Sequence, residues 1–196
     1  RLSEGMPVVE GATIVCAPTF RGQMDSATSV VVTMVGPTQI RWTRHDGVLT
    51  LEVDFGRVLL AASEPDVAVN VMLAGRPLGL RLPDVDSVVA ASARHLRLPG
   101  SDPLAEDNRS SLAGVLVVRG TASLESGDGT GMLETGQQWI QQGDSQPQVS
   151  TLEAIPDWVD PPDPNESTLE SAAREGLIAI LSADQSLDLS LREATG

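Results

Sequence analysis

The sequence has one cysteine, two histidines and no lysine or tyrosine among its 196 residues. One cysteine cannot form an internal disulfide bond. Cys16 lies in the apolar run 12–17, where no positively charged neighbour would stabilise a thiolate, so we expect a buried structural thiol. Two histidines and one cysteine cannot supply a zinc site by themselves. We therefore expect no metal ion and no other cofactor.

Positive charge and aromatic side chains are also scarce. The net charge is −14, and aromatic residues make up only 3% of the chain. An acidic chain repels nucleic-acid backbones and anionic membrane surfaces, so we expect no nucleic-acid partner and no membrane contact by this part of the protein. Scarce aromatics also disfavour a glycan-binding or ligand-binding β-sandwich, which stays an alternative interpretation.

Long hydrophobic runs are absent as well. No apolar stretch approaches the roughly 18–20 residues that a membrane-spanning helix needs. The chain begins with Arg1 rather than methionine. We expect that a signal peptide or membrane anchor lies upstream in the full-length protein.

What the sequence does contain is a series of short strand patterns. Hydrophobic residues make up 41% of the chain, and alternating apolar and polar residues occur in 38–43, 48–55 and 67–73. Asp46-Gly47 separates the first two of these runs and is a typical hairpin turn. Frequent short strands with regular turn signals predict a mainly β fold, either an antiparallel β-sandwich or a short β-solenoid.

A weak internal repeat accompanies these strands. The run from Gly47 to Leu60 resembles the run from Gly114 to Leu124, with Gly56 and Gly120 at equivalent places. Two strand–glycine–strand units of this kind would stack on each other. A glycine-rich tip at 126–131 follows the second unit and predicts a further hairpin.

Composition changes toward the C-terminus. We assign residues 1–155 to a β-rich domain, 156–165 to a proline-rich extended linker and 166–196 to a small helical segment. Ser167 and Glu170 form a capping box at the start of this segment. Trp158, inside the linker, is expected to pin the linker onto the β domain.

No pattern identifies a catalytic or binding residue. Ser87, His95 and an aspartate could form a dispersed hydrolase triad, which we keep as a second alternative, although no Gly-x-Ser-x-Gly motif surrounds any serine. His45-Asp46 fits a polar hairpin tip better than an acid/base pair. We therefore expect a protein that is not an enzyme.

Two groups of charged residues are candidates for further binding sites. Four acidic residues near the linker could hold calcium, but a solvated acidic segment is the simpler interpretation. They are Asp157, Asp160, Asp163 and Glu166. Five arginines would form a basic patch only if the fold brought them together. They are Arg76, Arg81, Arg94, Arg97 and Arg119.

Two central segments resemble the FecR-like domain, the extracytoplasmic part of bacterial anti-sigma regulators. Gly120–Leu124 matches a strand step of that family, and Leu133–Gln138 matches its "Leu-x-x-Gly-Gln-x" step. Earlier steps resemble 35–40 and 51–58, so the similarity spans about residues 10–145.

The resemblance implies a non-enzymatic module that senses a signal or binds a protein partner, in signal transduction to a sigma factor. It also implies a periplasmic or extracytoplasmic location and a membrane anchor in the full-length protein. It brings no catalytic, cofactor-binding or metal-binding residues, and the binding residues stay unknown. Recognition by a sheet edge or hairpin, such as strand addition to a partner, would suit such a module.

Overall fold

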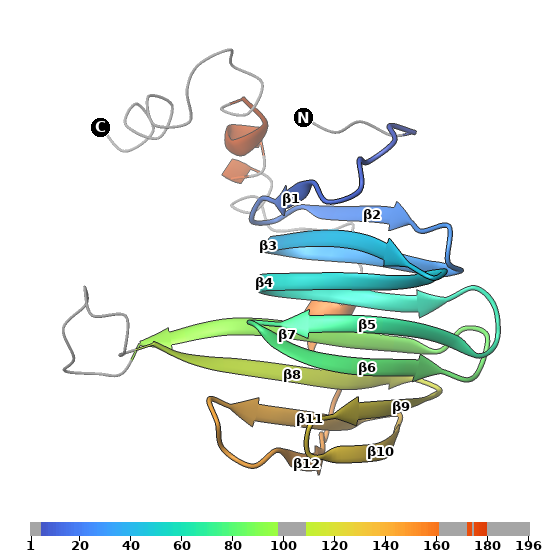
Figure 1. Cartoon of the computed structure of the whole chain (residues 1–196). Helices are drawn as coiled ribbons and strands as arrows, with labels where there is room; N and C mark the ends of the chain where they lie inside the picture. Colours follow the sequence, from blue (N-terminus) through green and yellow to red (C-terminus); the bar gives the residue numbers. More distant parts are fainter. Residues whose placement is uncertain (1–4, 98–108, 161–171, 174, 180–196) are drawn as a thin grey trace. The chain divides into compact units, whose positions relative to one another are not determined.

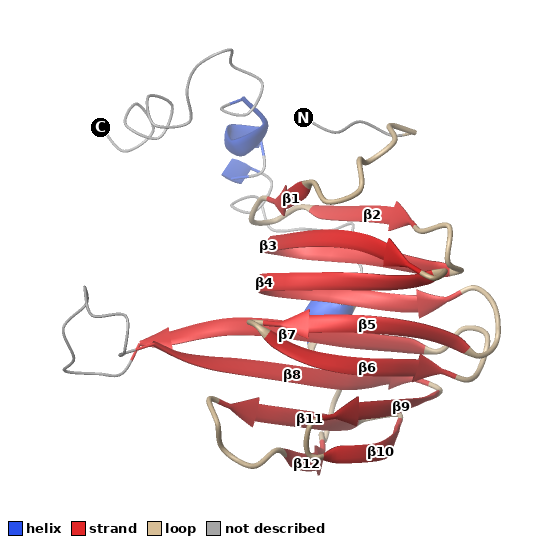
Figure 2. Cartoon of the chain, viewed as in Figure 1, coloured by secondary structure: helices blue, strands red, loops and turns tan. Residues whose placement is uncertain are grey.

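The computed structural model describes residues 5–97, 109–160, 172, 173 and 175–179. Val9–Asp160 forms one compact unit. The rest of the chain forms a second unit, in which residues 172, 173 and 175–179 are helical. The predicted mainly β fold class is confirmed, with a short helix near the C-terminus (Figure 2).

The strands of the first unit belong to a single curled sheet. They are β1 (Thr13–Cys16), β2 (Arg21–Asp25), β3 (Val30–His45), β4 (Val48–Ala62), β5 (Val67–Leu73), β6 (Arg76–Leu82), β7 (Val88–Arg97), β8 (Arg109–Arg119), β9 (Thr121–Ser126), β10 (Gly129–Glu134), β11 (Gln137–Gln142) and β12 (Gln148–Thr151). The pairs are antiparallel except for β4 with β5, which run parallel.

Two long strands fold the sheet into two layers (Figure 1). The first half of β4 pairs with β5, and its second half pairs with β7. β3 follows β4 along its whole length and is flanked by β1 on one half and β2 on the other. The first layer therefore contains β1, β5, β6, β9 and β10, and the second layer contains β2, β7, β8, β11 and β12.

Glycine makes the bend between the layers sterically possible. Gly56 has a φ of +104°, and a Cβ there would lie 2.5 Å from the carbonyl oxygen of Pro37 and from the Cα of Thr38. The buried Thr38 hydroxyl holds both strands at this corner, because it accepts from Arg57 N–H at 3.0 Å and donates to the Val35 carbonyl. A Cβ at Gly36 would meet the carbonyl oxygen of Ala17 at 1.8 Å, so there is no room for a side chain at either of these two glycines.

Gly120 forms a second corner, where the chain leaves β8 for β9. Its φ is +77°, and a Cβ would lie 2.7 Å from the Ser87 hydroxyl, which belongs to the β6–β7 connection. The buried positions change from odd to even numbers across this glycine. The weak repeat seen in the sequence thus corresponds to two strands that each cross between layers at a glycine, Gly56 and Gly120.

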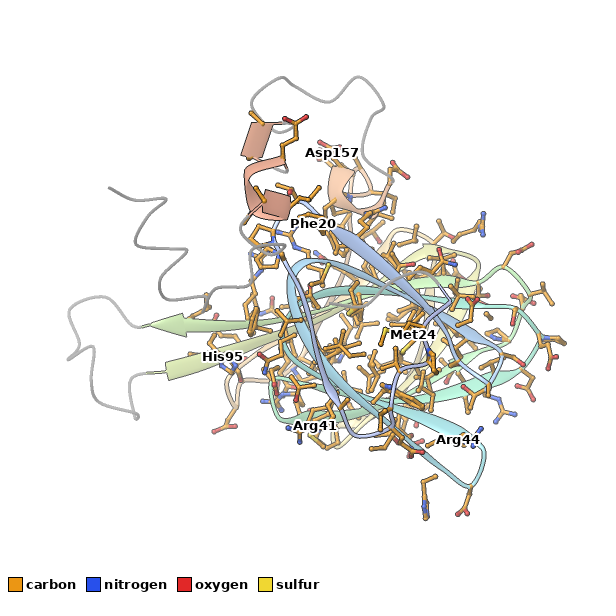
Figure 3. All side chains as sticks on the ribbon, turned by 90° about the horizontal axis from the view of Figure 1, so that it is seen from above. Phe20, Met24, Arg41, Arg44, His95 and Asp157 are labelled. Carbon is orange, nitrogen blue, oxygen red and sulfur yellow. The ribbon has the colours of Figure 1, made fainter. Side chains whose placement is uncertain are left out.

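The core lies between the two layers and is aliphatic. In most strands, alternate residues point inward and are almost fully buried, as the period of two requires. The largest of them include Ile40, Leu49, Leu51, Leu60, Leu73 and Leu82. Figure 3, viewed from above, shows side chains filling this space, with Arg41 on the outer side of the first layer and Asp157 beyond the second.

The outer face of the second layer is covered by the segment that follows β12. Residues 152–160, which we call the strap, cross this face and include a short 3-10 turn at Asp157–Val159. Val159 is buried against Ala90 and Leu116, and Trp158 packs beside them. Arg21 donates to the carbonyls of Trp158 and Val159, the latter at 2.9 Å. The expectation that Trp158 pins this segment to the β domain is therefore confirmed.

Some sequence interpretations need correction. Gly36-Pro37 follows the apolar run 30–35 and resembles a strand end, but β3 continues through it with an irregular register. The same holds for Gly56 within β4. The strands β2, β11 and β12 were not predicted. The proposed linker 156–165 contains a 3-10 turn in its described part, whereas 161–165 and most of 166–196, including the capping box, lie outside the described residues.

Candidate functional site

Four strands form the lateral edges of the two layers. β1 and β2 lie at one side of the sheet, and β10 and β12 lie at the other. An edge strand exposes unpaired peptide groups that can pair with another chain, so natural proteins usually protect such edges with charge, proline, bulges or short length. The edge with the least protection is the best candidate for binding a partner.

The edge formed by β1 and β2 is closed on its inner side. Ile14 and Cys16 of β1 point inward and are each 6% exposed, while the outward Val15 is 64% exposed. β2 carries Arg21 and Asp25 at its two ends. A further strand at this edge would therefore bury little additional core surface.

The β10 edge is protected in other ways. Gly129 and Gly131 lie within it, and glycine weakens strand pairing because it loses more backbone entropy. The N–H of Glu134 is already occupied, since the Gln137 side-chain oxygen accepts from it at 2.8 Å. The inward Leu133 is fully covered.

The β12 edge has the least protection. Its sequence, Gln-Val-Ser-Thr, contains no charge and no proline, and all four residues are exposed. Val149 pairs with the buried Trp139 of β11 yet is itself 60% exposed. The remaining protection of β12 is its shortness. We take this edge as the candidate site.

The hydrogen bonds of β12 show which peptide groups are free. Leu152 N–H donates to the Gly136 carbonyl at 2.9 Å, so the peptide groups of residue 152 point toward β11. Because successive residues of a strand point their peptide groups to opposite sides, those of Ser150 also face β11. The N–H and C=O groups of Val149 and Thr151 therefore face away from the sheet.

The residues of the hydrolase alternative do not meet. Ser87 precedes β7 and His95 lies near its other end, about 26 Å apart at the usual rise of an extended strand. The Ser87 hydroxyl is buried without a hydrogen-bond partner in the described part of the chain, and His95 Nε2 lies 3.0 Å from the Asp54 carbonyl oxygen. This pair cannot act as nucleophile and base.

The two hairpin tips are as the sequence predicted. Asp46 and Gly47 have φ angles of 50° and 80°, as a tight hairpin requires. His45 Nε2 and Asp46 Oδ2 lie 3.3 Å apart and are fully in solvent. Ser126 pairs with Gly129 across the second tip. Among the described residues no three His, Cys, Asp or Glu side chains are placed to hold a metal ion.

Three of the five arginines of the possible basic patch have separate partners. Arg76 donates to the Gly143 carbonyl, Arg119 donates to the Asp86 carbonyl, and Arg81 pairs with Asp66. The Arg81 guanidinium lowers the pKa of the Asp66 carboxyl through its hydrogen bond. The side chain of Arg97 and the acidic residues Asp163 and Glu166 lie outside the described residues.

The remaining candidates are structural. Burial raises the pKa of the Cys16 thiol, which opposes thiolate formation. Arg57 stacks over the Trp158 ring at 5.1 Å, and desolvation lowers its pKa, with a smaller effect from Arg94. The three tryptophans are buried or half-buried. The described residues therefore offer no exposed tryptophan for stacking against a sugar.

This arrangement of strands resembles two crystal structures of a candidate anti-sigma factor from Parabacteroides distasonis ATCC 8503. The TM-scores are 0.50 and 0.49, each at 12% identity. Each match covers 71% of this chain and 59% of the other. The fold is similar to that of an anti-sigma regulator. No protein-family model and no curated protein matches the sequence.

Sequence reasoning missed the candidate site itself. β12 has a single apolar residue, so its alternation is too short to stand out from a loop. The available signal was the turn-like sequence Gly143-Asp144-Ser145, which directly follows β11. In the described part of the chain, no helix is both long and apolar enough to span a membrane.

Proposed function

We propose that Val9–Asp160 is a non-enzymatic protein-interaction or sensing module of an extracytoplasmic signalling regulator, FecR-like in kind. In this role it binds a protein partner outside the cytoplasm, and the rest of the full-length protein relays that event to a sigma factor. The observation that carries the proposal is the fold similarity to the candidate anti-sigma factor. The resemblance of residues 10–145 to FecR-like domains supports it independently.

The geometry of the unit suits binding more than catalysis. Its two layers are joined by strands that bend closely at glycine corners and enclose an aliphatic core, and this packed unit presents the sheet edges. Ser87 and His95, the residues of the hydrolase alternative, are separated along β7. A sigma-factor regulator needs only a partner-binding surface here, which the sheet edges can supply.

The test is an in-frame deletion of residues 9–160 in the native host, followed by sequencing of the transcripts. We expect a coordinated change in genes that share one promoter sequence, as loss of control over one sigma factor would produce. Unchanged transcription would contradict the signalling role. The variant His95→Ala should keep the wild-type response, and loss of the response with an intact fold would argue for catalysis.

The extracytoplasmic location has its own test. Alkaline phosphatase, which folds actively only after export, would be fused behind Gly196 in the full-length protein. We expect phosphatase activity in whole cells. An inactive but stable fusion would place the module in the cytoplasm and remove the sensing part of the proposal.

A further inference from the structure

We propose that the β12 edge binds an extended segment of a partner protein, which adds as a new strand to the second layer. The segment has β-branched or apolar residues at its centre and basic residues at its ends. This inference rests on the proposed function, because it identifies the surface and the chemistry of the protein partner. The backbone, the side chains and the charges at β12 each support this assignment.

The backbone of β12 offers a short ladder of hydrogen bonds. Val149 and Thr151 together present two N–H and two C=O groups away from β11, as the bond from Leu152 to Gly136 shows. An incoming strand would pair with these four groups without disturbing those that hold β12 to β11. Main-chain pairing of this kind provides affinity with little dependence on side-chain identity.

Side chains at this edge would gain from such a strand. Val149 lies on the inner side of the layer, next to Trp139, and is 60% exposed. The inward positions of β1, by contrast, are already buried, with Ile14 and Cys16 each 6% exposed. A strand added at β12 therefore covers apolar surface that nothing else covers in the described unit, and this favours an apolar residue at the segment's centre.

Charge distinguishes the ends of the segment from its centre. β12 itself is uncharged, but the exposed Asp144 precedes it and the exposed Glu153 follows it. The exposed Asp144 forms a loose ion pair with Arg76 at 3.9 Å, which offsets part of its charge. The chain as a whole carries −14. Basic residues flanking the segment would meet these two carboxylates and would be attracted over longer distances.

The same charges argue against a second copy as the occupant. Two chains of −14 repel each other, and the acidic residues beside β12 would come close in an edge-to-edge pair. A separate segment of opposite charge fits the edge better.

The experiment uses the full chain and a synthetic capped peptide with a Thr-Val-Thr-Val-Thr centre and a lysine at each end. We expect saturable binding and at least about tenfold slower hydrogen exchange at the amides of Val149 and Thr151. A peptide with the same sequence but N-methylated at every residue of its centre has no N–H group on either edge, cannot complete the ladder and should bind at least about tenfold more weakly. Equal binding of the two peptides, or none, would overturn the proposal.

Two matched variants test the location. Val149→Lys places a charge on the inner side of β12, whereas Val15→Lys makes the same change at a valine of similar exposure on β1. Both change the net charge equally. We expect Val149→Lys to weaken peptide binding at least about tenfold and Val15→Lys to alter it by less than about twofold. Equal weakening in the two variants would show that only net charge matters.

The transcript assay separates this inference from the proposed function. If deletion of residues 9–160 changes transcription and Val149→Lys reproduces that change, both are supported. A response to the deletion alone would keep the function and reject the β12 edge. If neither alters transcription, the function fails, and the peptide titration alone decides whether the edge binds strands.

Discussion

Replacing Gly56 by alanine tests whether the corner between the layers depends on the absence of a side chain. Two effects add. A φ of +104° is strained for any residue with a Cβ, which costs about 1–2 kcal/mol. The new Cβ would also lie 2.4–2.5 Å from Thr38 and Pro37 atoms, two of them backbone, and overpacking of this kind costs about 1–3 kcal/mol.

The Thr38 hydroxyl cannot rotate away to relieve this contact. It is fully buried and bonded to the backbone of Val35 and Arg57, so movement would break the link between β3 and β4. We therefore expect Gly56→Ala to lower the free energy of unfolding by about 2–5 kcal/mol, a large part of the usual total for a domain. Urea denaturation followed by far-UV circular dichroism measures this difference.

Two other glycines provide the controls. Gly75 has a φ of +82° but open space around its Cβ position. Gly75→Ala should therefore lower the free energy of unfolding only by the cost of the strained φ, about 1–2 kcal/mol. Gly131 has open space and no positive φ, so Gly131→Ala should be neutral within about 1 kcal/mol. If Gly56→Ala costs no more than Gly75→Ala, close packing at the corner is not what holds the layers.

Other parts of the unit give further predictions. Val159→Ala should lower stability by about 1.5–2 kcal/mol in the same urea assay, because it removes buried methyl groups that fix the strap. The pKa of Cys16 is raised on folding, so stability should be constant at neutral pH and fall as the pH rises through the ordinary thiol range toward the higher folded value, as denaturation at several alkaline pH values would show. A Cys16→Ser variant should lose this alkaline dependence. The pKa of Asp66 is lowered by Arg81, so NMR titration of the Asp66 carboxyl should show it ionised further into acid than in Arg81→Gln, and equal titration would refute the pair.

The sequence contained the local features of the fold. β5 occupies the residues predicted for it, because Val67–Leu73 alternates over its whole length between turn residues. The Asp46-Gly47 hairpin also formed as predicted, since its geometry depends on two adjacent residues alone. Such features need no information about distant parts of the chain.

Features that depend on distant contacts were not predictable in this way. Gly36-Pro37 resembles the end of a strand, yet β3 continues because β4 pairs with it on both sides of the irregularity. β2 contains Met24 as its single large apolar residue and is a strand because β3 supplies the partner. The candidate edge was hidden for the same reason, since β12 is defined by its pairing with β11 rather than by its own pattern.

The glycine corners and the open edge have a common physical consequence for binding. β12 is already paired with β11, so its edge is formed before a partner arrives, and the corners at Gly36, Gly56 and Gly120 have no room for a Cβ. A preformed edge requires little ordering when a strand is added, and the cost of binding falls mainly on the incoming segment. A partner segment that is already extended would therefore bind more tightly than a flexible one of the same composition. Closing the lysine-ended peptide into a hairpin should strengthen its binding, and an unchanged affinity would show that the ordering cost lies in β12 instead.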